Sequence, residues 1–380
     1  IITQLLVENE LLEKGLSKED VGRENFISKV WEWKEKSGEN ISGQMKKLGM
    51  SCDWSRERFT MDEGLSAAVR QVFVTLYDSG FIYKGSRMVN WDTKLMSAVS
   101  DLEVNLEEQT GKLWSVKYKC GDEFITIATT RPETILADTA VAVNPDDERY
   151  KSFIGKTAII PIVNREVPII ADEYVDKEFG SGCVKITPAH DFNDYEIGLK
   201  HDLEVISCMK LNGTMSDDDF MPENYKNLDR FEARDQIVNE LSELGFLVSA
   251  DDHVIQLPKG DRSKSILEPM ITDQWFVKTK ELANRGIAEV ENENMKFIPK
   301  NWEKTYFEWM YNIQDWCISR QIWWGHQIPA WYDEEGNIYV ATTESEVREK
   351  YKLSDDLKLS QDKDVLDTWF SSALWLSLIH

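Results

Sequence analysis

The residue pattern of this chain changes near residue 108 and changes back near residue 257, and this limits its possible folds more than any other feature. Residues 1–108 carry helical spacings of apolar residues and one strand-like run. Residues 109–256 carry short strand-like runs separated by turn residues, and residues 257–380 return to a mixture of helix and strand patterns. Two flanks of one kind around a middle of another predict a domain inserted into a second domain.

The flanks are expected to form α/β structure. Leucines at positions 5, 6, 11 and 12 predict a first helix that Gly15 ends, and the Ser17–Asp20 box predicts the start of a second. An apolar face over 66–78 predicts a further helix, which a strand over 81–91 follows. The returning flank is expected to hold a Trp-rich helix over 302–309.

The middle segment is expected to be a compact, mostly β domain with a few helices. Helical pattern is limited there to 191–201 and 230–244, and the acidic run Asp217–Asp219 is interpreted as a solvated turn. The strands are expected at 113–118, 124–129, 157–163, 167–170 and 183–187.

Composition and charge favour a small-molecule enzyme. The net charge is −24, from 44 Lys and Arg against 68 Asp and Glu, and such a surface repels the phosphates that dominate nucleic-acid binding. The five cysteines show no Cys-x-x-Cys spacing, so no metal site and no redox pair is predicted. No apolar run approaches the roughly 20 residues that cross a bilayer, and no signal peptide is recognisable, so a cytoplasmic protein without a membrane partner is expected.

The first candidate site is Thr129-Thr-Arg-Pro-Glu-Thr134, where a proline ends a predicted strand. Hydroxyls, a guanidinium and a carboxylate converge there, as is common at ligand sites. An ordinary turn is the alternative, with Thr130 and Thr134 bonding local backbone and Arg131 pairing with Glu133.

The second candidate site is Gly180-Ser-Gly-Cys-Val-Lys-Ile-Thr-Pro-Ala-His-Asp-Phe-Asn-Asp-Tyr195, a glycine turn, a short strand and a helix start. Asp191 and Asp194 are three residues apart and share one helix face. Both could simply stabilise the helix N-terminus, Asp191 as its cap. The alternative is a rigid carboxylate that binds a substrate ammonium, with Lys185 and His190 nearby.

The third feature is the aromatic run Trp316–His326, with Asp364–Ala373 further on. Tryptophans in such runs more often belong to a core than to a site. The sequence contains no Walker-type phosphate loop, no dinucleotide-binding glycine motif in a strand–turn–helix context and no Gly-x-Ser-x-Gly elbow.

The combination and order of these motifs closely resemble class I aminoacyl-tRNA synthetases for branched aliphatic amino acids. The first two motifs resemble their editing domain, and Asp315–Tyr332 with Asp364–Trp375 resembles the second half of their catalytic domain. Thr129–Thr134 and Asp367-Thr-Trp-Phe-Ser-Ser372 favour the valine-specific members over the isoleucine-specific ones. The resemblance implies a Rossmann-like catalytic domain interrupted by an editing domain at residues 109–256.

What the resemblance implies for the whole enzyme is ligation of valine to tRNA(Val) with ATP and Mg²⁺. The family's HIGH motif is expected before residue 1 and its KMSKS loop after His380, since neither occurs in this chain. The chain is therefore expected to be an internal fragment, monomeric and unable to activate valine alone.

By the same resemblance, the editing domain hydrolyses threonyl-tRNA(Val), whose acylated 3′ end it binds without a cofactor. Asp194 would anchor the α-ammonium, and Thr129, Thr130 and Arg131 would hold the terminal adenosine and orient water. The remaining expected site residues are Lys185 and Asp191, which would shape the pocket, Phe179 and His190 on the substrate side, and Trp324 and Trp369 bordering the valine pocket.

Three other readings stay open: an isoleucine-specific synthetase, a stand-alone small-molecule esterase, and a tRNA-binding module without catalysis. The esterase and the module each require several motif matches to be discarded together, and the isoleucine-specific synthetase is disfavoured by the two motif variants above. Activity on simple esters without tRNA would favour the esterase, and binding of mischarged tRNA without hydrolysis would favour the module.

Overall fold

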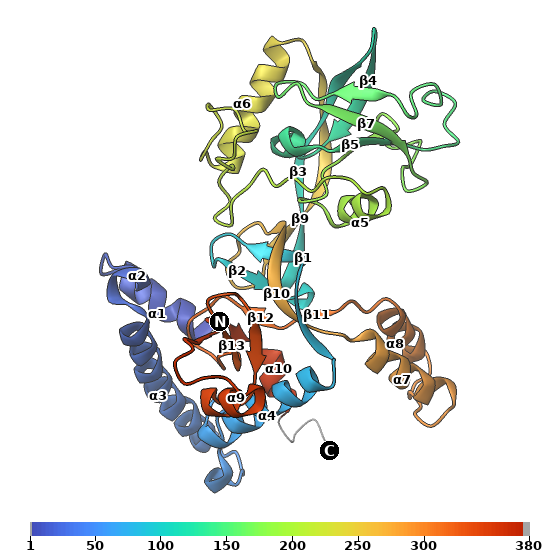
Figure 1. The fold of residues 1–380 in the computed structure, drawn as a ribbon. Coiled ribbons are helices and arrows are strands. Elements are labelled where there is room, and N and C mark those ends of the chain that lie inside the picture. The colour runs from blue at the N-terminus through green and yellow to red at the C-terminus, as the bar shows by residue number, and fades with distance from the viewer. Residues whose placement is uncertain (1, 375–380) are drawn as a thin grey trace. The chain divides into compact units, whose positions relative to one another are not determined.

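The structure is a computed structural model that describes residues 2–374, so Trp375, at the end of the last motif, lies outside the described residues. The chain divides into two compact units (Figure 1). Unit 1 consists of the residues up to Gly85 together with those from Asp273 onward, and unit 2 is Ser86–Thr272.

Unit 1 begins with three helices: α1 (Ile2–Leu12), α2 (Lys18–Val21) and α3 (Arg23–Lys47). The predicted box at Ser17 is confirmed, because the Ser17 hydroxyl accepts a hydrogen bond from the Asp20 backbone N–H at 3.1 Å and the Asp20 carboxylate accepts from the Ser17 N–H. This reciprocal pairing satisfies two donors that a helix start leaves without partners.

The later elements of unit 1 are short strands and helices. Helix α4 begins at Glu63, three residues before the predicted start, because Asp62 caps it by accepting from the Leu65 N–H at 2.9 Å. The elements after α3 that lie wholly or partly in unit 1 are η1 (Trp54–Arg56), α4 (Glu63–Asp78), β1 (Ile82–Asp92), β10 (Glu268–Val277), α7 (Lys280–Glu291), α8 (Trp302–Tyr311), β11 (Trp316–Cys317), β12 (Ser319–Arg320), β13 (Ala330–Tyr332), β14 (Ile338–Val340), α9 (Glu344–Tyr351), β15 (Ser360–Gln361), β16 (Val365–Leu366) and α10 (Thr368–Ser372).

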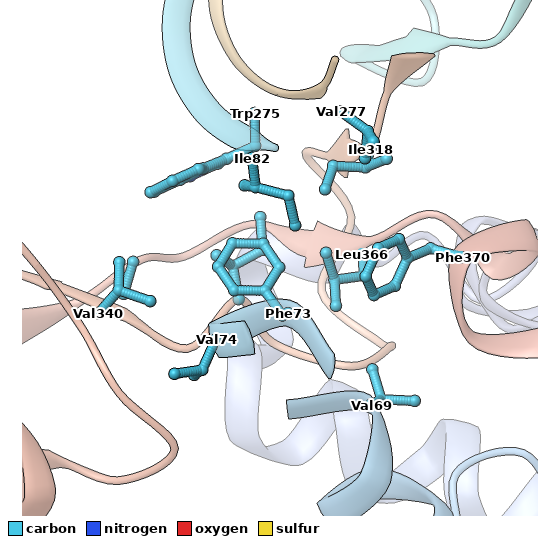
Figure 2. Close-up of a cluster of buried hydrophobic side chains, with 12 residues drawn as sticks. Val69, Phe73, Val74, Ile82, Trp275, Val277, Ile318, Val340, Leu366 and Phe370 are labelled. Atoms are coloured by element: carbon cyan, nitrogen blue, oxygen red, sulfur yellow. The ribbon is translucent and has the colours of Figure 1, made fainter. Parts of the chain in front are cut away.

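The main apolar cluster of unit 1 is built from the segments before and after unit 2 (Figure 2). Phe73 of α4 is fully buried, and its ring centroid lies 5.4 Å from that of Trp275 and 6.3 Å from that of Phe370. Ile82 and Leu366 belong to the same cluster. Residues before and after unit 2 therefore share one core, as an inserted unit requires.

Unit 2 is built around a seven-stranded sheet with two flanking α-helices, and its strand β2 pairs with β1 in a separate sheet. The strand order is β4-β3-β6-β7-β5-β8, with β9 paired to β3, and its pairings are antiparallel except that between β5 and β7. The elements of unit 2 after β1 are β2 (Ser97–Val99), η2 (Asp101–Glu103), β3 (Val104–Cys120), β4 (Glu123–Thr129), η3 (Pro132–Ala137), β5 (Ala140–Val143), β6 (Thr157–Ile159), β7 (Glu166–Ala171), β8 (Cys183–Ile186), α5 (Phe192–Lys200), α6 (Arg230–Glu243) and β9 (Leu247–Gly260).

Unit 2 extends beyond residues 109–256 because β3 and β9 pair along their full length, from Val104 opposite Gly260 to Val116 opposite Leu247. In Figure 1, β3 (teal) and β9 (gold) run alongside each other as two long strands. The other elements predicted in this region are present, and Asp217–Asp219 is exposed as expected of a solvated turn.

A small apolar cluster fixes helix α5 on the sheet. Ile197 of α5 packs against Ile186 of β8 and Ala140 of β5, and Val175 fills the same cluster. Burying these side chains holds the start of α5 beside the end of β8, where the second motif lies. No helix within residues 2–374 is long and apolar enough to cross a membrane.

Candidate active site

The first motif forms a tight turn at the end of β4. The Thr129 hydroxyl accepts a hydrogen bond from the Arg131 N–H at 3.0 Å, and the Thr134 hydroxyl donates to the Arg131 carbonyl at 3.0 Å. Arg131 Nε also lies 3.1 Å from a Glu133 oxygen. The local bonds expected of an ordinary turn are therefore present for Thr134 and Arg131, while the half-buried Thr130 hydroxyl has no hydrogen-bond partner within the described part of the chain.

The second motif runs from a glycine turn through β8 into α5. Asp191 caps the helix, because its Oδ1 accepts from the N–H groups of Asn193 at 2.8 Å and Asp194 at 3.1 Å. The capping alternative for Asp191 is thus confirmed. Gly180, with φ +56°, leaves room for the neighbouring strand, since a Cβ there would lie 2.9 Å from the Ala128 Cβ.

The two motifs meet in unit 2. Arg131 Nη1 donates to the His190 carbonyl at 2.9 Å, and the close approach of Gly180 to Ala128 brings the glycine turn against β4. Residues 59 positions apart therefore form one site.

Asp194 is the unusual group in this site. Its side chain is buried, with the residue only 7% exposed, and its Oδ2 accepts the Thr187 N–H at 2.8 Å. No lysine or arginine of the described chain forms an ion pair with it. Burial, aided by the negative charge of Asp191 and only partly opposed by Lys185, raises the pKa of Asp194 to about 7.

A second buried group of polar side chains lies next to Asp194. Lys185 Nζ lies 3.1 Å from Asp138 Oδ1 and also contacts the Thr187 hydroxyl, which donates to Asp138 Oδ1 at 2.6 Å. Tyr118 donates to the other Asp138 oxygen at 2.5 Å. Lys185 is therefore held as an ion pair, and its charge is already compensated by Asp138.

His190 and Phe179 occupy different surroundings. The His190 ring is buried, and burial lowers its pKa to about 3, so the imidazole is neutral. Its Nε2 accepts the Cys208 N–H at 2.9 Å, which assigns the proton to Nδ1. Phe179 is half exposed at the glycine turn, with its ring 5.8 Å from that of His253 in an edge contact.

Arg131 is supported by Glu133, the partner expected in an ordinary turn, and by three charged residues that the sequence did not single out. Glu133 is fully buried and also binds Arg234, at 2.7 and 2.8 Å. Burial tends to raise the pKa of Glu133, but Arg234 and Arg131 outweigh this effect, so the pKa is lowered and Glu133 is ionised. Glu268 binds both Arg131 and, at 2.7 Å, Arg230.

Trp324 and Trp369 lie in unit 1. Trp324 is buried in a cluster with helices α1 and α3, and its ring centroid is 5.5 Å from that of Trp31. Trp369, near the start of α10, is 59% exposed. Among the described residues, no group of three His, Cys, Asp or Glu side chains is placed to hold a metal ion.

The comparison with known families defines the class of protein. The family described as tRNA synthetases class I (I, L, M and V) matches residues 1–379. The chain therefore belongs to the class I tRNA synthetases.

Valine–tRNA ligases are among its similar relatives. The one from Legionella pneumophila (strain Paris) is 57% identical over 377 residues, which is 99% of this chain and 41% of that protein. The one from Francisella tularensis subsp. tularensis is 55% identical over the same shares. The chain thus spans about two fifths of the length of these curated relatives.

A solved structure also matches: the ternary complex of Agrobacterium radiobacter K84 LeuRS with tRNA and LeuAMS. The match has a TM-score of 0.35 and 16% identity, and it covers 92% of this chain and 49% of that one.

Sequence reasoning missed several residues of the site for two different reasons. Thr187 stands inside the second motif but resembles an ordinary turn residue. Asp138, Arg234 and Glu268 lie outside the motifs, and only the fold brings them to the site.

Proposed function

We propose that unit 2 hydrolyses threonyl-tRNA(Val), so that this chain contributes the proofreading step of a valine–tRNA ligase. The observation that carries the proposal is Asp194, a buried carboxylate without a cationic partner in the described chain. A bound aminoacyl ester would supply that cation as its α-ammonium, in a charge-assisted hydrogen bond.

The neighbouring groups suit the rest of an acylated tRNA end. The Thr130 hydroxyl lacks an internal partner and is available to bind substrate or water, and the exposed ring of Phe179 is available for stacking on the terminal base. Thr129 and Arg131 shape the turn that carries Thr130.

Hydrolysis of an activated ester needs a positioned water and an electrostatic environment more than a covalent nucleophile. The neutral, buried His190 does not suit a general base, because its Nε2 already accepts a backbone N–H. We therefore assign the reaction to a water molecule positioned by bound substrate, Thr130 and Asp194.

A proofreading site is needed because valine and threonine have nearly the same shape. A valine pocket rejects threonine only roughly 100-fold, a figure established for this class of enzyme rather than derived from these residues. A second pocket with polar groups for the threonine hydroxyl leaves those groups unpaired with a valyl ester, which costs about 1–3 kcal/mol.

For the full-length enzyme, we propose ligation of valine to tRNA(Val) with ATP and Mg²⁺. Trp324 and Trp369 would border its valine pocket. The acidic balance of this chain, −24, is compatible with such a partner if tRNA is bound mostly by other parts of the enzyme.

The test is to measure the hydrolysis of threonyl-tRNA(Val) and valyl-tRNA(Val) by this chain and by its Asp194→Ala variant, with Glu196→Ala as the matched control. Glu196 is an exposed acidic residue on the same helix as Asp194. We expect the wild-type chain to hydrolyse the threonyl ester fast and the valyl ester slowly. Asp194→Ala should lose most of the threonyl hydrolysis, and Glu196→Ala should lose none. Equal rates on both esters would contradict the proposal, and hydrolysis of simple esters without tRNA would favour an esterase.

A further inference from the structure

Arg131 occupies the centre of an ionic cluster in unit 2 whose two glutamates are buried. Its guanidinium contacts Glu133 through Nε, the His190 carbonyl through Nη1 and Glu268 through Nη2. All three nitrogens are thus bound within the protein, so Arg131 links the segments that carry Glu133, His190 and Glu268.

Each glutamate of the cluster has a second arginine. Arg234 binds Glu133, and Arg230 binds Glu268, both from helix α6. The side chain of Glu133 is fully buried and that of Glu268 is 4% exposed, so neither charge can be left without a partner at low cost. The cluster therefore fixes the direction of the Arg131 side chain firmly.

One contact of Arg131 is with the backbone carbonyl of His190, next to the candidate active site. The His190 carbonyl accepts from Arg131, and the His190 ring accepts from the Cys208 N–H, so this residue is held on two sides. The next residue, Asp191, caps α5, and Asp194 stands in the first turn of that helix. Any shift of His190 would be passed to the Asp194 carboxylate.

Glu268 contributes a link to another part of the chain. It is the first residue of β10, the strand through which the chain returns to unit 1, yet its carboxylate is bound to Arg131 of the first motif. None of the motifs contains it.

We propose that Glu268 is a positioning residue for the deacylation reaction: through Arg131 it holds the backbone at His190 and so sets the position of the Asp194 carboxylate. This inference rests on the proposed function of unit 2. Substrate binding should depend on it less than the reaction rate does, because a small displacement of reacting groups lowers the rate more than the affinity.

The experiment measures kcat and KM of this chain on threonyl-tRNA(Val) for Glu268→Gln, Glu268→Asp, Arg131→Lys and the double variant Glu268→Gln with Arg131→Lys. The control is Glu240→Gln, which removes the charge of a partly buried α6 carboxylate that accepts from Tyr225 and does not touch Arg131. We expect Glu268→Gln to lower kcat roughly 10- to 100-fold with little change in KM. Glu268→Asp should recover part of the loss, and the double variant should be no slower than the slower single variant.

A folded Glu268→Gln variant with the wild-type kcat would overturn the inference, as would a loss in kcat that the Glu240→Gln control shares. If Glu268→Gln does not fold, Arg131→Lys decides, and a wild-type kcat in folded Arg131→Lys overturns the inference. Failure of the proposed function looks different, because the wild-type chain itself would then not hydrolyse threonyl-tRNA(Val).

Discussion

At the scale of single residues, Asp194 differs from the other buried carboxylates around it. Glu133, Asp138 and Glu268 each bind an arginine or lysine, whereas Asp194 accepts one backbone N–H. Within residues 2–374 its charge has no ionic partner, which is the property a site for an ammonium group needs.

The buried charge should make folding depend on pH. The pKa of Asp194 is about 7 in the folded chain against an ordinary 3.8, so between these values the folded state binds more protons than the unfolded state. The free energy of unfolding must then fall as pH rises through this range. We predict that Asp194→Asn, which keeps an acceptor for Thr187, unfolds at least about 2 °C above wild type at pH 8 and near wild type at pH 4, by calorimetry. A lower midpoint at pH 8 would contradict this.

The same ionisation should control the reaction rate. Only ionised Asp194 attracts an ammonium, so kcat/KM for threonyl-tRNA(Val) should rise with pH up to about 7. It should fall again as the substrate α-amino group, with an ordinary pKa of roughly 7.7–8.0, loses its proton. Single-turnover rates from pH 5.5 to 8.5 would show both limbs, and a flat profile below pH 7 would exclude Asp194 as the anchor.

At the scale of elements, the helices and strands that could be predicted from the sequence have a regular spacing of apolar residues or a recognisable capping residue. Helix α5, β4 and β8 are such elements, whereas β5 and β9 were missed. Strand β5 is four small or branched apolar residues buried on both faces, which have no alternation to detect. Strand β9 has two aspartates in its middle and only one buried residue, and it pairs with β3 along nearly its whole length.

The same distinction applies to the site. Asp194, Lys185 and Thr130 could be named from local motifs. The support of Arg131 by Glu268 could not be predicted, because the two residues are 137 positions apart and no local pattern relates them.

The cap of α5 allows the structural and chemical roles of Asp191 to be separated. Asp191→Ala removes an acceptor for two N–H groups and should lower the free energy of unfolding by about 1 kcal/mol, whereas Asp191→Ser should keep most of it. We predict that Asp191→Ser also keeps most of the deacylation rate. Urea unfolding and single-turnover assays test this, and an inactive but stable serine variant would show that the Asp191 charge acts on the substrate.

At the scale of the whole molecule, unit 2 interrupts a domain whose core joins distant parts of the chain. The cluster in Figure 2 contains Phe73 and Ile82 from before the insertion and Trp275 and Phe370 from after it. Because each apolar cluster lies within one unit, the two units should unfold as separate cooperative transitions.

Phe73→Ala tests that separation. Removing this fully buried ring should cost unit 1 about 3–5 kcal/mol, because the cavity is lined by Trp275 and Phe370. We expect calorimetry to show one transition lowered and the other unchanged, with deacylation retained below both. A single transition that moves as a whole would show that the units are not independent.

The central claim is that Asp194 binds the α-ammonium of a misacylated tRNA during its hydrolysis. The most direct measurement compares wild type and Asp194→Asn on threonyl-tRNA(Val) and on an otherwise identical ester with a hydroxyl in place of the α-amino group. A charge-assisted bond of about 1.5–3 kcal/mol predicts that the kcat/KM of wild type is roughly 10- to 100-fold lower on the hydroxy ester than on threonyl-tRNA(Val). The kcat/KM of the folded variant on threonyl-tRNA(Val) should be lower than that of wild type by the same factor. The variant should hydrolyse the two esters with equal kcat/KM. If the folded variant hydrolyses threonyl-tRNA(Val) at the wild-type rate, the claim is wrong.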